Sequence, residues 1–155
     1  MPKLADEIKS KPFTHLEEEA MLNIIRTADV LMQRASHVLK QFDLRVSQYN
    51  VLRILRGSKD GISCGQIAER MISRDPDITR LLDRLETRGL IARERSGQDR
   101  RVVTARISAE GLKVIEQINP LIVQEHGRQL GALGQAKLRQ LIELLEQVRE
   151  TSQPN

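Results

Sequence analysis

The chain has 155 residues, of which 39% are hydrophobic and 30% are charged, as in a single soluble globular domain rather than a disordered segment. Its aromatic residues are few (Phe13, Phe42 and Tyr49), which argues against the stacking platforms that bind RNA or single strands. The formal net charge of +4 equals that of segment 70–106 alone, which holds ten arginines, six carboxylates and no lysine. Arginine binds phosphates and guanine edges bidentately, so this composition favours contact with duplex DNA.

Nothing in the sequence predicts a membrane span or an export signal. No apolar run approaches the roughly 20 residues that a spanning helix needs. Residues 1–11 alternate charged and apolar side chains without a hydrophobic signal region. Cys64, the one cysteine, has no partner for an internal disulfide. We therefore expect a cytoplasmic protein that does not associate with membranes.

The first predicted element is a long helix behind a tail at residues 1–12. Residues 14–17 match a capping box with Thr14 as the N-cap, and apolar residues then recur every three or four positions, as on one face of a helix. They are Met21, Ile24, Ala28, Leu31, Ala35, Val38 and Phe42. About 27 residues at 1.5 Å per residue span roughly 40 Å. Because such a helix is longer than a globular domain of 155 residues can cover, we expect part of its apolar face to contact another chain.

Three short helices are predicted next. The first covers residues 48–56, with Gly57 as its stop signal. A capping box at 63–66 opens the second, and Asp75 as N-cap with Pro76 at the first helical position opens the third. Their inward-facing residues are predicted to be Val51, Leu52 and Leu55, then Ile67, Ala68 and Met71, then Ile78, Leu81, Leu82 and Leu85. The last two helices, joined by a brief turn, form a helix-turn-helix.

Two strands are predicted after Gly89, where the third short helix is expected to end. They cover residues 90–95 and 102–107, and apolar and polar side chains alternate along the second, as expected for a half-buried strand. A polar hairpin behind a helix-turn-helix is a wing.

The C-terminal part is predicted to be helical. Ser108 is the expected N-cap of a helix that breaks or kinks near residues 119–120, since proline disrupts helices. Gly127, Gly131 and Gly134 then predict a loose connection. The last predicted helix, 135–149, carries a heptad-like apolar row of Leu138, Leu141, Leu145 and Val148.

The third short helix, 75–88, is the candidate recognition helix. Its exposed face is predicted to hold Asp77, Arg80, Asp83, Arg84, Thr87 and Arg88. Thr79 and Arg80 are the best candidates for contacts with base edges, and Arg80 can bind guanine bidentately. The alternative is a merely solvated helix. Three arginines at i, i+4 spacing argue against it, because like charges stacked on one face cost stability unless an anion neutralises them.

Further DNA contacts are predicted on the hairpin and at the start of the second short helix. Arg100 and Arg101 can reach a narrow minor groove, with Asp99 holding one guanidinium; the alternative is a charged turn that is only solvated. Backbone N–H groups at Ser63, Cys64 and Gln66 can face a phosphate. Arg74, between the two helices, completes the set of predicted DNA contacts.

Neither catalysis nor metal binding has a recognisable motif here. Cys64 near a helix start is either a redox-sensitive thiol or, as we favour, a small core residue. His15, His37 and His126 are scattered and lack the spacing of metal ligands. No phosphate-binding loop, nucleophile elbow or Cys/His pair occurs. We therefore expect neither enzymatic activity nor a cofactor.

Several segments together resemble the MarR family, which are bacterial winged-helix transcriptional regulators. They are SCGQIAER at 63–70, DITRLLDRLETRGLI at 77–91, DRR at 99–101 and ISAEG at 107–111. The resemblance covers roughly residues 15–150. It implies a mainly α (α+β) fold in one domain, with a winged helix-turn-helix lobe at 46–107 and dimerisation helices at 13–42 and 110–150.

The same resemblance implies a function. It predicts an obligate homodimer that binds a pseudo-palindromic operator, in which Asp99 orients Arg101 toward the minor groove. Such regulators usually repress a neighbouring operon until a small, often phenolic, ligand binds or a cysteine is oxidised. The peroxide-sensing branch has its reactive cysteine in the first helix, where this chain has none.

An effector site is expected between the dimerisation helices and the lobe. The predicted lining residues are Met32, Arg34, His37, Tyr49 and Arg53. Among them, Arg53 or His37 can meet a carboxylate. Three alternatives stay open: a winged helix that is architectural or binds protein, a regulator that responds to metal or redox state, and an enzyme, for which no cluster of titratable residues is recognisable.

Overall fold

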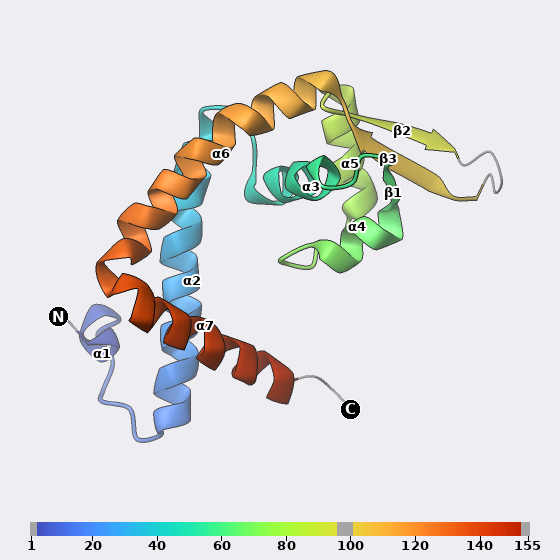
Figure 1. The fold of residues 1–155 in the computed structure, drawn as a ribbon. Coiled ribbons are helices and arrows are strands. Elements are labelled where there is room, and N and C mark those ends of the chain that lie inside the picture. Colours follow the sequence, from blue (N-terminus) through green and yellow to red (C-terminus); the bar gives the residue numbers. More distant parts are fainter. Residues whose placement is uncertain (1–2, 96–100, 153–155) are drawn as a thin grey trace.

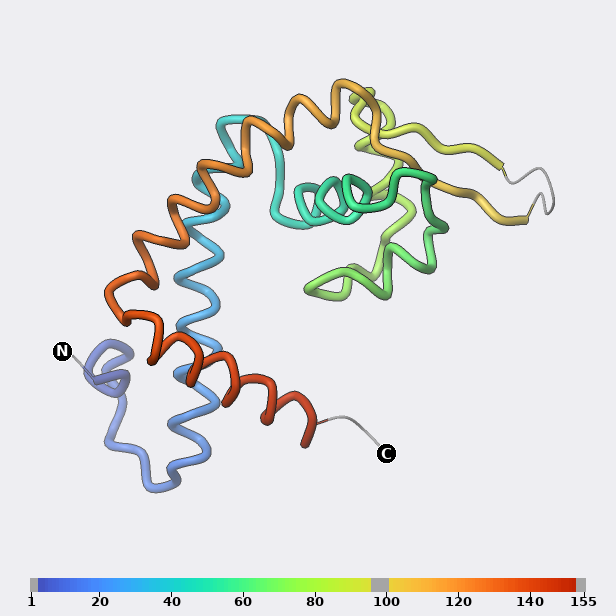
Figure 2. The backbone as a smooth tube through the Cα atoms, viewed as in Figure 1, coloured from blue at the N-terminus to red at the C-terminus, as the bar shows by residue number. Residues whose placement is uncertain are grey.

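The chain folds into a helical frame and a small lobe. The long helix α6 starts at the lobe and runs into the frame (Figures 1 and 2). This computed structural model describes residues 3–95 and 101–152. The frame contains α1 (Leu4–Glu7), α2 (Leu16–Lys40), α6 (Ala109–Leu130), a 3₁₀ turn (Gly131–Leu133) and α7 (Gly134–Thr151). The lobe contains α3 (Val46–Arg56), α4 (Cys64–Arg70), α5 (Ile78–Thr87) and the strands β1 (Ile62–Ser63), β2 (Ile91–Arg95) and β3 (Val103–Ile107).

The three strands form one antiparallel sheet in the order β1–β3–β2. Ile91 pairs with Ile107 and Arg95 with Val103, so β2 and β3 are the two strands of the predicted wing. In β3 the alternation is as predicted, with Ala105 buried and Arg106 exposed. β1 was not predicted. It has only two residues and exists through its pairing with β3, which no local pattern reveals.

The core lies mainly inside the lobe. Its fully buried residues come from all three lobe helices and from both long helices: Leu39, Val51, Leu52, Leu55, Ile67, Leu82, Leu85, Ile115 and Ile118. Most residues predicted to face inward do so, but Ala68 is exposed. The seven-residue α4 buries only Ile67, and the neighbouring Ala68 is turned about 100° away from it. Met71 reaches the core from the C-cap position, after the helix has ended.

Two predicted helix caps are confirmed, and two were misplaced. The Ser63 and Ser108 hydroxyls accept from the backbone N–H groups of Gln66 (3.2 Å) and Gly111 (3.0 Å). The N-cap of α2 is His15 rather than Thr14. Leu16 is 78% exposed, so nothing packs against this first turn and fixes the predicted cap.

The cap of α5 is Asp77 rather than Asp75. An Asp75 carboxylate oxygen accepts from the backbone N–H of Asp77 (3.0 Å), which forms a turn around Pro76. Asp77 then accepts from the backbone N–H of Arg80 (3.1 Å). The candidate recognition helix therefore begins two residues later than the proline signal suggested.

The C-terminal half is more continuous than predicted. A break or kink was predicted near Pro120; α6 runs through Pro120 without a break and follows a curved path (Figure 1). The expected loose connection is also wrong, because α6 includes Gly127 and reaches Leu130, and a single 3₁₀ turn leads into α7. Gly134 has a φ of +71°, the left-handed conformation that turns the chain sharply between the two helices.

The frame leaves apolar surface uncovered. The half of α2 nearer the lobe packs on the core through Ala35, Val38 and Leu39. The other half does not, since Met21 and Ile25 are 55% and 56% exposed. α7 has no buried residue. Within residues 3–95 and 101–152, none of the helices combines the length and the apolar content needed to cross a membrane.

Candidate nucleic-acid interface

α5 has one buried and one charged face, as predicted. Leu81, Leu82 and Leu85 are buried on the lobe side. The residues that point outward are Asp77, Thr79, Arg80, Asp83, Arg84 and Thr87. Ten residues at 1.5 Å each make a rod of about 15 Å, which a DNA major groove can accommodate.

One arginine of the neighbouring strand pairs with both carboxylates of α5. Arg93 of β2 forms ion pairs with Asp83 and with Glu86, the latter at 3.0 Å. Its backbone N–H also donates to Glu86, at 2.8 Å. These hydrogen bonds from Arg93 hold the pKa of the Glu86 carboxyl below its usual value, against a smaller opposing effect of desolvation. The acidic residues of the helix therefore serve the packing of α5 on β2 instead of cancelling its outward arginines.

The row of three arginines divides into two roles. Arg88 donates to the backbone carbonyls of Phe42 (3.1 Å) and Asp43, and so attaches the end of α5 to the loop behind α2. Arg80 and Arg84 have no ion pair anywhere in the part of the chain that the structure describes. These two charges, one turn apart, therefore face outward together.

The start of α4 offers fewer donors than predicted. Gln66 donates its backbone N–H to the Ser63 hydroxyl, and Ser63 donates its own to the Gln66 side chain at 3.0 Å. Both N–H groups thus already donate within the cap, and a phosphate would have to replace their present acceptors, the Ser63 hydroxyl and the Gln66 side chain. Cys64 is half-buried and packs against the core, as expected of a core residue.

The structure describes only one of the three wing residues that were predicted to contact DNA. Asp99 and Arg100 lie outside the described residues, so their predicted roles stay predictions. Arg101 is exposed and comes two residues before β3 begins. Arg74 is exposed in the turn between α4 and α5.

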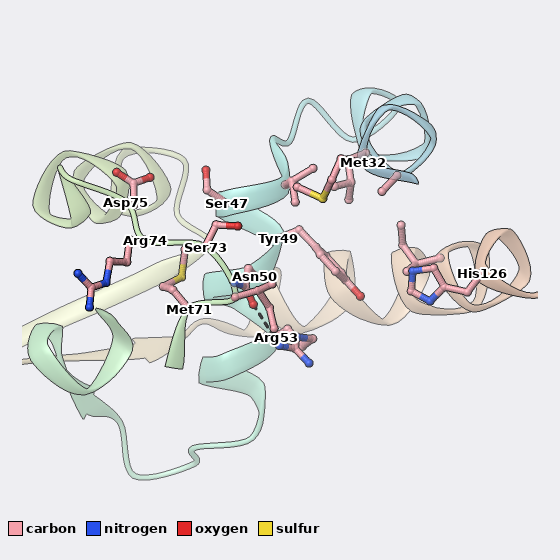
Figure 3. Close-up of a pocket in the computed structure, with 15 residues that line it drawn as sticks. Met32, Ser47, Tyr49, Asn50, Arg53, Met71, Ser73, Arg74, Asp75 and His126 are labelled. Atoms are coloured by element: carbon pink, nitrogen blue, oxygen red, sulfur yellow. Dashed lines mark hydrogen bonds between the residues drawn. The ribbon is translucent and has the colours of Figure 1, made fainter. Parts of the chain in front are cut away.

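A cavity of about 460 Å³ lies where the frame meets the lobe (Figure 3). Met32 of α2 and Tyr49 and Arg53 of α3 line it, as predicted. Arg34 and His37 do not; they line a separate hollow with Glu125 and Arg128. At about 100° per residue, Ala35 and Leu39 share the face of Met32, whereas position 34 lies across α2 and His37 meets Met32 only at the edge of another hollow.

Several lining residues of this central cavity were not predicted. They include Asn50, Met71, Ile72, Arg74, Asp75 and His126. The segment 71–75 connects α4 to α5, so the cavity wall is continuous with the segment that leads into the recognition helix. One signal was available in the sequence, namely Ile72, an apolar residue between two predicted helices. In the structure this side chain is 78% exposed.

The cavity combines apolar walls with a few polar groups. The Tyr49 hydroxyl donates to the Asn119 side chain of α6 (3.1 Å), and Arg53 donates to the side chain of Asn50 (3.2 Å). Burial raises the pKa of Tyr49 above its ordinary value of 10.0, although the nearby charges of Arg53 and Arg56 oppose this. Tyr49 therefore stays neutral at physiological pH. Across the described residues there is no cluster of His, Cys, Asp and Glu that could hold a metal ion.

A helix-turn-helix that packs one face on a core and is followed by an antiparallel hairpin defines the class of winged helix-turn-helix proteins. The model of the MarR family matches residues 44–103, which are the lobe. The transcriptional repressor IacR of Pseudomonas putida is 30% identical over 116 residues, which are 75% of this chain and 69% of IacR. The chain belongs to the MarR family.

Solved structures agree with this assignment. A MarR transcription factor from Planctomyces limnophilus is 41% identical, with a TM-score of 0.68, over 87% of this chain and 98% of that protein. The MepR–DNA complex of S. aureus is 24% identical, with a TM-score of 0.77, over 90% of this chain and 99% of MepR. At that identity, the likeness to MepR shows the fold.

Proposed function

We propose that the chain is a sequence-specific double-stranded DNA-binding regulator that represses transcription as a homodimer in the cytoplasm. The observation that carries this proposal is the outward face of α5, where Arg80 and Arg84 project while the carboxylates beside them pair with Arg93. IacR, a relative at 30% identity, is a repressor, and MepR, a protein of the same fold, has been solved with DNA. Repression is the direct result when such a protein occupies an operator.

Two copies are needed for this mechanism. Exposed apolar residues on α2 and α7 supply a surface that a second chain can cover, in agreement with dimerisation through 13–42 and 110–150. A two-fold dimer spaces its recognition helices about one DNA turn, or roughly 34 Å, apart. Each α5 then contacts one half of a pseudo-palindrome, and each wing contacts the adjacent minor groove.

The central cavity is the proposed effector site. Its walls are largely apolar, while Arg53 and Arg74 are cationic, which suits a small aromatic molecule with an anionic group. Because segment 71–75 belongs both to the wall and to the lead into α5, a ligand there can favour one position of the recognition helix over another. Only such a difference in affinity between the two positions shifts the equilibrium.

Replacement of Arg80 by alanine tests base-specific binding. A bidentate contact with guanine is worth about 1–3 kcal/mol, so affinity for each half-site is expected to fall roughly 5- to 150-fold, and affinity of the dimer for the full operator by more. Affinity for random duplex is expected to fall much less, since it depends on phosphate contacts. Fluorescence anisotropy with the DNA upstream of the protein's own gene and with a scrambled duplex measures both. An equal loss on the two duplexes would refute base contact by Arg80, and equal affinity of the wild type for both would favour an architectural role.

A further inference from the structure

The fold brings part of the frame against the recognition helix. Between the end of α2, the start of α3 and the second half of α5 lies a hollow of about 520 Å³. Four cations line this basic hollow, Lys40, Arg45, Arg84 and Arg88, with Asp43 as its single carboxylate. Lys40 and Arg45 come from outside the segment 70–106 that carries the net charge of the chain.

The negative charge in this hollow is already engaged. Arg88 lies 4.0 Å from the Asp43 carboxylate and also donates to the carbonyl of Asp43. Lys40, Arg45 and Arg84 form no ion pair with any residue described by the structure. Three cations gathered around one concavity repel one another, so the arrangement is stabilised when an anion enters.

The basic hollow continues the outward face of α5. Arg84 follows Arg80 by one helical turn, and Thr87 follows Arg84 by three residues, so all three share that face. Arg84 and Thr87 also line the hollow. When the first half of α5 lies in a major groove, the hollow therefore lies beside it, where the phosphates that border the groove run.

We propose that Lys40 and Arg45 hold phosphate groups of the DNA backbone beside the groove that α5 enters. This inference rests on the proposed function. It gives the end of a dimerisation helix a direct contact with DNA. Phosphate contacts fix the register and orientation of a protein on the duplex, so Lys40 and Arg45 would set the depth and angle of α5.

Charge-removing variants test the inference. Lys40→Gln and Arg45→Gln each delete one proposed phosphate contact per protomer, and therefore two in the proposed dimer. Arg45 takes part in the cap of α3 through its backbone N–H to Gln48, so Arg45→Gln leaves that bond in place. Each contact contributes a slope of about 0.9 in the dependence of log K on log salt, which is roughly eightfold in affinity at 0.1 M relative to 1 M salt. Because the dimer loses two contacts, each variant is expected to bind about 60-fold more weakly at about 0.1 M salt, equally for operator and random duplex, with the salt slope lower by about 1.8.

Matched controls are available at the end of α3. Arg56→Gln and Lys59→Gln remove the same charges from exposed positions outside the predicted DNA contacts and the dimerisation segments, and are expected to change neither quantity. Thermal melts establish that all four variants fold. If the wild type binds its operator but the double variant Lys40→Gln/Arg45→Gln keeps the wild-type affinity and slope, the inference is overturned and the proposed function stands. If the wild type binds no duplex, both fail.

A titration with inorganic phosphate at constant ionic strength separates the two sources of the same anion. Loss of phosphate-induced thermal stabilisation in the double variant, with DNA affinity unchanged, would indicate a site for free phosphate and would overturn the assignment to the DNA backbone. Loss of DNA affinity and salt slope together supports it.

Discussion

Gly111 occupies a position where no other residue fits. It lies in the first turn of α6, and a Cβ atom there would meet the carbonyl oxygen of Leu90 at 2.1 Å and a side-chain atom of Ile107 at 2.9 Å. Gly111→Ala must push the start of α6 away from the sheet, at a cost of about 1–3 kcal/mol in the free energy of unfolding, the usual range for overpacking. Urea unfolding measures the loss.

Gly127→Ala, in the same helix, is the matched control. A Cβ at position 127 meets nothing within 4 Å. Since alanine is favoured over glycine inside helices by about 0.5–1 kcal/mol, this variant is expected to unfold at higher urea. Equal effects of the two substitutions would show that the close contact with Leu90 does not hold in solution.

Glu86 makes the stability of the lobe depend on pH. Its pKa is lower in the folded chain than its ordinary value of 4.5, chiefly because Arg93 donates to it. A carboxyl with a lowered folded pKa contributes stability above its unfolded pKa, and that contribution is lost as pH falls through the folded value. The side chain is 38% exposed, so screening keeps the contribution below about 1 kcal/mol.

The matching measurement is the free energy of unfolding at about pH 6 and about pH 3 for wild type and Glu86→Gln. The wild type should lose more stability over this interval, because glutamine has no charge to lose. A decline of the same size in both proteins would mean that the pairing with Arg93 contributes nothing to acid sensitivity.

At the scale of elements, Arg93 couples α5 to β2. Arg93→Ala removes the cationic partner of Asp83 and Glu86 on the proposed recognition helix, where their unpaired charges would repel DNA phosphates. We expect weaker binding to operator and random duplex alike, with a stability loss below about 1 kcal/mol because both carboxylates are more than one-third exposed. Addition of Asp83→Asn and Glu86→Gln to this variant should restore much of the affinity. Failure of that rescue would point to a misplaced helix rather than to uncompensated charge.

Helix α6 shows where a local rule gives way to packing. Proline inside a helix costs about 3 kcal/mol, which is why a break or kink near Pro120 was expected. Ile115, Ile118 and Ile122 are buried on both sides of it. Complete burial of such side chains is worth about 1.5–3 kcal/mol each, so an unbroken, curved helix outweighs the lost hydrogen bond. The order of elements and the lobe core could be predicted, because amphipathic spacing and caps are local.

The cavity shows what local patterns cannot supply. Met32, Tyr49 and Arg53 were predicted by position, but Arg34 and His37 lie on another face of α2. His126 is distant in sequence and joins the cavity only through the packing of α6. The basic hollow was missed for the same reason, since Lys40 and Arg84 are brought together by the fold alone.

At the scale of the whole molecule, the uncovered apolar surface predicts the assembly state. Ile25 on α2 and Ile142 on α7 are 56% and 55% exposed. Ile25→Glu and Ile142→Glu place a charge where the proposed dimer would bury an apolar group, which is costly for an unpaired ion. Light scattering should therefore find a dimer for the wild type and a shift toward monomer for both variants.

The loss of dimer should also weaken operator binding. Two linked recognition helices bind two half-sites with an affinity that exceeds that of one helix by about 100-fold or more. The monomeric variants are thus expected to lose at least that factor on a full palindrome, and much less on a single half-site. Ile72→Glu is the control, because Ile72 is 78% exposed but lies in the lobe, and it should leave the molar mass unchanged. If the double variant Ile25→Glu/Ile142→Glu stays dimeric, the dimer contact lies elsewhere on the chain. The spacing of the two α5 helices is then set by another interface.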